Sequence, residues 1–107
     1  MITEITEKTK GEGLVTTLFL DKPISTTMGW ECHLIKVDTL FCPPSEEEKE
    51  AGYVTMAFGY FPSFKVDTSN LRYTQKAKDA KEARKNHFNL LRELKECYFT
   101  GEKFRIR

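Results

Sequence analysis

Residues 73–98, YTQKAKDAKEARKNHFNLLRELKECY, form the longest periodic stretch of the chain and decide its fold. At about 100° per residue, the apolar residues of this stretch fall on one side of a helix. The apolar stripe consists of Ala80, Ala83, His87, Leu90, Leu91, Leu94, Cys97 and Tyr98. Basic residues flank it on one side and acidic residues on the other. The pattern predicts an amphipathic helix that packs its stripe against another surface.

The rest of the chain offers that surface as β-strands. We expect strands at Leu14–Leu20, Trp30–Phe41 and Tyr53–Phe61, because these segments are rich in β-branched and aromatic residues. In Tyr53–Phe61 a bulky set of residues alternates with a mostly small set, which would leave room for the helix. The bulky set is Val54, Met56, Phe58 and Tyr60, and the other set is Tyr53, Thr55, Ala57 and Gly59.

Shorter segments complete the expected sheet. Ile2–Thr9 fits an edge strand or a frayed end, and Phe64–Val66 fits a hairpin partner of Tyr53–Phe61. Lys103–Arg107 alternates basic and apolar residues and is expected to form a last strand. Within Trp30–Phe41 the alternation slips at Lys36–Val37, which indicates a bulge or a strand buried on both faces.

Turn and capping residues predict where these elements begin and end. Pro23 is expected to end the first strong strand, because proline cannot donate to a ladder. Ser45–Glu48 resembles a capping box, so we expect a short helix there that Gly52 closes. Asp67–Asn70 is dense in N-cap residues, so the long helix could begin one turn before its stripe. Gly101 is expected to lie in its C-terminal cap region.

These patterns together predict a single α+β domain over residues 1–107. Its antiparallel sheet has four or five strands. One long C-terminal helix packs on one face of the sheet, and a short helix lies in a connection.

The composition favours a cytoplasmic globular domain. Charged residues make up 31% of the 107 residues and the hydrophobic class 39%, which suits a modest core. The formal net charge of +1 predicts neither nucleic-acid binding nor an acidic partner, so a charged partner would have to be attracted by a local patch. No run approaches the roughly 18 apolar residues of a membrane span, and Met1–Lys10 lacks the apolar core of a secretory signal. The odd number of cysteines favours free thiols.

Residues suited to chemistry are present without a catalytic or metal-binding pattern. Cys32 and His33 are adjacent, so in a strand they point to opposite faces and do not share an ion easily. Cys97 lies about 15 Å along the helix from His87, too far for a hydrogen bond. A thiol enzyme that uses Cys32 with His87 stays open as an alternative. We expect no enzymatic activity, no cofactor and no metal.

One helix can cover one face of a sheet, so the other face is expected to stay uncovered. Aromatic residues left there would form a patch that binds protein. The leading expectation is a small non-catalytic protein-binding module, an inhibitor or accessory factor of a virus or mobile element that occupies a partner protein's surface. A homodimer is a further option. The expected contact residues are Tyr60, Phe61 and Phe64 for apolar contact, and Lys81, Lys85 and Arg92 for charged contact.

The alternative is a nucleic-acid-binding protein that uses a basic helix ridge. A ridge of lysines and arginines can contact phosphates. Its expected members are Lys78, Lys81, Lys85 and Arg92, joined by Arg105 and Arg107 if the last strand lies beside the helix. Acidic residues on the same helix weaken this interpretation, because they give a solvated face of mixed charge.

Overall fold

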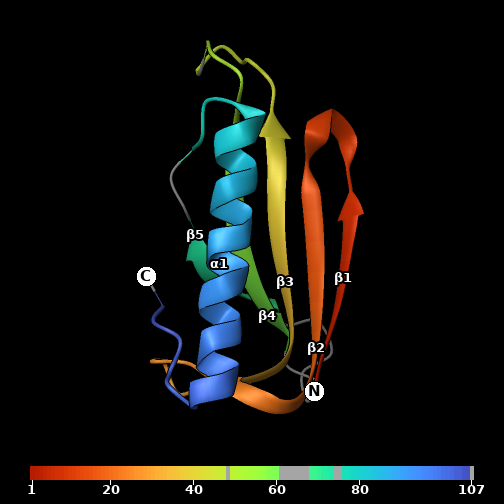
Figure 1. Ribbon diagram of the computed structural model, residues 1–107. Helices are drawn as coiled ribbons and strands as arrows, with labels where there is room; N and C mark the ends of the chain where they lie inside the picture. Colours follow the sequence, from red (N-terminus) through yellow and green to blue (C-terminus); the bar gives the residue numbers. More distant parts are fainter. Residues whose placement is uncertain (48, 61–67, 74–75, 107) are drawn as a thin grey trace.

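The computed structural model describes residues 1–47, 49–60, 68–73 and 76–106, and shows an antiparallel sheet with one long helix across it (Figure 1). The elements in chain order are β1 (Ile2–Lys8), a 3-10 turn (Lys10–Glu12), β2 (Leu14–Ser25), β3 (Glu31–Cys42), β4 (Gly52–Tyr60), β5 (Thr68–Tyr73) and α1 (Ala80–Thr100). The strands lie in the sheet in their order along the chain, from β1 to β5. The α+β architecture expected from the sequence is confirmed.

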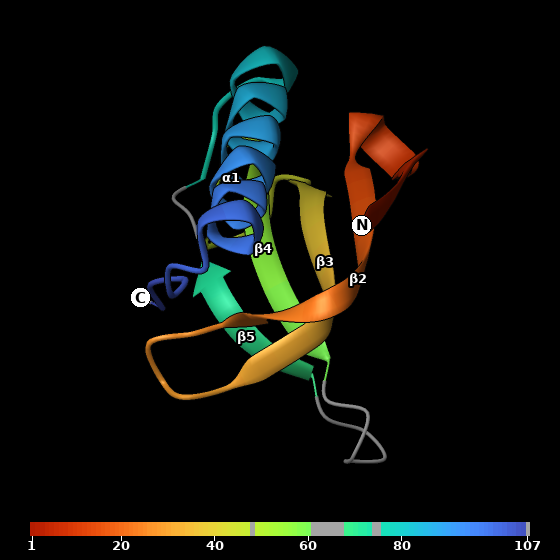
Figure 2. The same cartoon turned by 60° about the horizontal axis from the view of Figure 1, so that its bottom comes forward.

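The helix packs its predicted stripe on the middle of the sheet, against β2, β3 and β4 (Figure 1). The side chains of Leu90, Leu91 and Leu94 are buried there, with Leu18, Ile35 and Val37 facing them from the strands. Ala57 is also fully buried on this side of β4, so the small set of the predicted strand does leave room for the helix. Figure 2 shows α1 on one side of the curved sheet.

The long helix begins at Ala80, later than the sequence pattern predicts. Tyr73 belongs to β5, where it pairs with Met56 of β4. Ala77 exchanges two backbone hydrogen bonds with Tyr53, so the chain is still extended at that point. Asp79 then caps the helix, because its side chain accepts a hydrogen bond from the backbone N–H of Glu82 at 2.8 Å.

The expected start at Asp67–Asn70 is wrong, because Thr68–Asn70 opens β5. At the other end of the helix, Gly101 adopts φ +78° and its N–H donates to the Cys97 carbonyl. Its role as the C-terminal cap is confirmed.

Strand β2 continues through Pro23, where the sequence pattern predicts an end. Its pairing with β3 shifts between Phe19 and Ile24, so the residues between them form an irregular stretch that does not need an N–H at Pro23. On β3 the break in alternation falls opposite this stretch, between buried Cys32 and buried Ile35, and not at Lys36–Val37.

Three further expectations have different outcomes. Residues 43–47 and 49–51 contain no helix, and Gly52 begins β4, so the short acidic helix is not found in the described residues; Glu48 lies outside them. The expected last strand is wrong for the described part of 103–107, where Phe104 forms one isolated bridge with Thr26 and is fully buried. The expected corner at 61–64 and the strand at Phe64–Val66 lie outside the described residues.

Candidate functional site

The face of the sheet turned away from α1 carries apolar side chains with substantial exposure. Strand alternation and register place them in rows across β1 to β4. Phe19 and Ile5 are each 46% exposed and Leu40 is 39% exposed, although all three lie in regular strands. We call this surface the bare face, and its apolar members are Ile5, Val15, Phe19, Leu34, Leu40, Val54, Met56, Phe58 and Tyr60.

Two side chains of opposite charge, Lys36 and Asp38, lie at the centre of the bare face. Lys36 and Asp38 are two residues apart on β3, the middle strand of the five, so both side chains emerge on this side. The ammonium of Lys36 lies 5.4 Å from the centroid of the Tyr60 ring. The Oδ1 atom of Asp38 is buried without a hydrogen-bond partner, and burial raises the pKa of this carboxyl while Lys36 lowers it. A desolvated carboxylate oxygen is costly unless a cation compensates it.

The structure separates the two groups of residues expected to bind a protein. Tyr60 lies on the bare face, and Phe61 and Phe64 lie outside the described residues. Lys81, Lys85 and Arg92 are exposed on α1, which covers the opposite face (Figure 1). Arg92 donates to the Asn89 side chain at 2.6 Å. Tyr60 and the helix cations therefore do not form one continuous surface.

The residues of the expected nucleic-acid ridge are also dispersed. Lys78 precedes the helix and its cap, Arg105 is exposed in the segment after α1, and Arg107 lies outside the described residues. Lys81 instead lines a cavity of about 290 Å³ between the β1–β2 turn and the first turn of α1, together with Lys8, Arg84 and Glu12. Sequence reasoning missed Lys8, because it comes from β1, far along the chain from the helix.

His87 lies at the centre of a polar chain under the helix. Its Nε2 is 2.7 Å from the Thr16 hydroxyl and its Nδ1 is 2.9 Å from the Thr39 hydroxyl. Thr16 and Thr39 in turn contact Thr6 and Thr55, each at 2.8 Å. Both ring nitrogens are thus engaged by hydroxyls, and burial lowers the pKa of His87 to about 4. A neutral imidazole suits this chain, because it donates at one nitrogen and accepts at the other.

Both ring nitrogens of His87 contact hydroxyls, and the thiol-enzyme alternative with Cys32 stays a prediction. Cys32 is fully buried, and burial raises the pKa of its thiol to about 11, whereas a nucleophile needs a lowered pKa. No disulfide bond joins Cys32, Cys42 or Cys97. Within the described residues, no three His, Cys, Asp or Glu side chains are grouped so that they could hold a metal ion.

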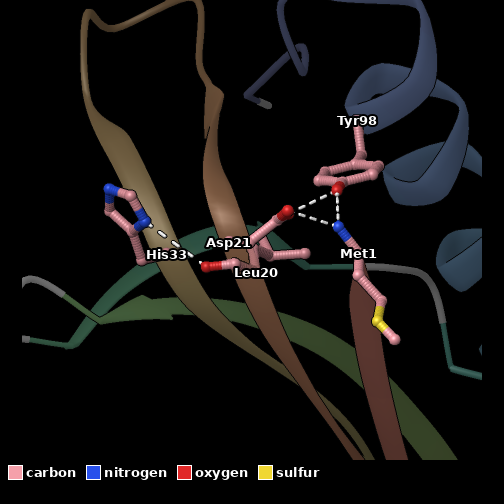
Figure 3. A network of polar contacts seen from close by, with 5 residues as sticks. All are labelled: Met1, Leu20, Asp21, His33 and Tyr98. Atoms are coloured by element: carbon pink, nitrogen blue, oxygen red, sulfur yellow. Dashed lines mark hydrogen bonds and ion pairs between the residues drawn. The ribbon is translucent and has the colours of Figure 1, made fainter.

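A polar cluster joins the start of β1, the irregular part of β2 and the last turn of α1 (Figure 3). The amino group of Met1 donates to the Tyr98 hydroxyl and pairs with Asp21, which also accepts from Tyr98. The hydrogen bonds from the amino group and from Tyr98 lower the pKa of Asp21 to about 2. Nearby, His33 Nδ1 lies 3.4 Å from the Leu20 carbonyl. These contacts join the start of β1 and the end of α1 to β2. None of the residues in the cluster is a member of the bare face.

Comparison of the chain with protein-family models, curated proteins and solved structures gave no significant match. In the part of the chain that the structure describes, no helix has the length and hydrophobicity needed to span a membrane.

Proposed function

We propose that this protein is a non-catalytic protein-binding module that acts through the bare face. The observation that carries the proposal is the exposure of Ile5, Phe19 and Leu40 on one continuous side of the sheet. Single exposed apolar residues are ordinary, but a contiguous exposed patch is typical of an interaction surface. Covering it gains about 25 cal/mol for each Å² of apolar surface removed from water.

The character of the surface favours a protein over a small molecule. Small ligands bind in concave pockets, whereas the bare face is one side of an open sheet whose apolar residues are spread over four strands. It combines aromatic and methionine side chains with few charges, as the centres of protein interfaces do. Such a module acts by occupying its partner's surface, as an inhibitor or accessory factor does.

The experiment compares two phenylalanines of almost equal exposure on opposite sides of the molecule. Phe19 is 46% exposed on the bare face, and Phe88 is 44% exposed on α1. Each is replaced in turn by the photo-crosslinking residue p-benzoylphenylalanine, and the protein is irradiated in extracts of the cells in which it occurs. We expect a discrete protein adduct from position 19 and none from position 88. Equal adducts from both positions, or none from position 19, would contradict the proposal.

The nucleic-acid alternative stays a prediction. Its support is the group of Lys8, Lys81 and Arg84 around one cavity, but Glu12 lines the same cavity and reduces its net charge. The bare face gives the stronger support, because Ile5, Phe19 and Leu40 stay exposed on it although they are apolar.

A further inference from the structure

We propose that the bare face binds a second copy of this chain, so that two sheets stack face to face with their β3 strands antiparallel. This inference rests on the proposed function and names the partner. A two-fold axis in the interface, perpendicular to the strands at the level of Val37, would bring Lys36 of each copy against Asp38 of the other.

The charges of β3 are self-complementary about that axis. In an isologous interface each residue meets the symmetry-related position of the other copy, so a lysine and an aspartate on either side of the axis form two reciprocal pairs. Asp38 already has one buried carboxylate oxygen without a hydrogen-bond partner. The ammonium of Lys36 from the other copy would offset the charge of this carboxylate from outside, without reaching the buried Oδ1 atom. Closely apposed charge pairs also fix the register of an interface.

The apolar rows of β3 and β4 agree with the same axis, whereas on β1 the axis relates Ile5 to Glu7. Val37 and Ala57 are register partners, so the axis that relates residues 36 and 38 also relates residues 56 and 58. Phe58 would then lie over Met56 of the other copy, a favourable contact between sulfur and an aromatic ring. Leu34 would lie over Leu40 in the same way. The central charges are thus flanked on β3 and β4 by apolar contacts on both sides.

The size of the face is sufficient for a reversible dimer. Four strands about 4.8 Å apart and about seven residues along each strand give a projected area on the order of 400 Å². The relief of the side chains increases the area removed from water, toward the roughly 800 Å² per partner of stable interfaces. Aligned sheet packing, with about 10 Å between the layers, accommodates such side chains.

The test is a charge-reversal experiment that includes its own rescue. Sedimentation velocity of the wild type from about 5 to 500 μM should show the mass rising from 12.4 kDa to twice that value. Lys36→Asp gives a face with two acids, and Asp38→Lys gives a face with two bases. The dimer dissociation constant of each variant alone should therefore rise at least about tenfold. An equimolar mixture of the two should recover a heterodimer. Circular dichroism checks that both variants are folded.

A second pair of variants tests the apolar part. Leu40→Arg on the bare face should abolish the dimer, whereas Phe88→Arg, which changes a residue of similar exposure on α1, should leave it intact. A wild type that stays at 12.4 kDa at 500 μM overturns the inference. So does a dimer that survives both charge reversals, because it must use another surface such as the edge of β1.

These outcomes are distinct from those of the proposed function. A monomer whose position 19 still crosslinks to a different protein would remove the second copy as the occupant and leave the protein-binding module in place. A dimer of the described kind would yield self-adducts from position 19.

Discussion

At the scale of single residues, His87 shows how a polar side chain can sit in the middle of a small core. The sequence pattern puts it on the apolar stripe, where a satisfied and half-buried imidazole is expected. The structure confirms that it is satisfied and shows it to be fully buried. Its partners Thr16 and Thr39 are 71 and 48 residues away, so no local pattern could have paired them with it.

The buried imidazole predicts a loss of stability in mild acid. Burial lowers the pKa of His87 from 6.5 to about 4, so between these values the unfolded chain binds a proton that the folded chain does not. Stability linked to His87 is complete above pH 6.5 and falls as the pH drops toward 4. We expect the free energy of unfolding in urea to be about 2 kcal/mol lower at pH 5 than at pH 7.5.

Two variants separate this effect from other titrations. His87→Asn removes the imidazole and should flatten the difference between the two pH values, although its stability is lower at both. His33→Gln changes the exposed histidine and should keep the full difference. An undiminished fall in the His87→Asn variant would show that another group is responsible.

At the scale of elements, the sequence predicts a helix or strand well where its burial pattern repeats over many residues. It predicts the ends of an element poorly, because each end depends on a few capping or turn residues. The stripe of α1 and the alternating sets of β4 are as expected, because each is repeated over many residues. Asp67–Asn70 and Asp79 offer similar capping side chains. The choice between them depends on the pairing of Ala77 with Tyr53, a tertiary contact. The predicted strand end at Pro23 is also wrong because of pairing between strands, since the irregular pairing of β2 with β3 accommodates a proline.

The start of α1 at its cap can be tested directly. Asp79→Ala removes the side chain that accepts from Glu82 N–H, so it should lower the free energy of unfolding by about 1 kcal/mol in urea titrations. Asp79→Ser retains an acceptor and should lose only a few tenths of a kcal/mol. An Asp79→Ala variant as stable as the wild type would mean that this residue does not cap the helix.

At the scale of the whole molecule, α1 covers one face of the sheet, and no helix among the described residues covers the other face. The sequence predicts this asymmetry, because it contains one long amphipathic helix. It identifies Tyr60 as a member of the bare face but misses Ile5, Phe19 and Leu40, which come from other strands. Alternation within Leu14–Leu20 does separate Phe19 from buried Leu18. Its neighbours across the sheet could be assigned only after the register of β1 to β4 was known.

The most direct test of the bare face as a binding surface is the solvent accessibility of its methyl groups, observed by NMR with a soluble paramagnetic probe. At low concentration, the methyl signals of Leu34, Leu40 and Met56 should broaden strongly, whereas those of Leu91 and Leu94 under α1 should stay sharp. When the protein associates with its partner, the account predicts that the bare-face signals become protected. Bare-face methyls that are already protected in the isolated chain, or that stay equally broadened in the associated state, would contradict it.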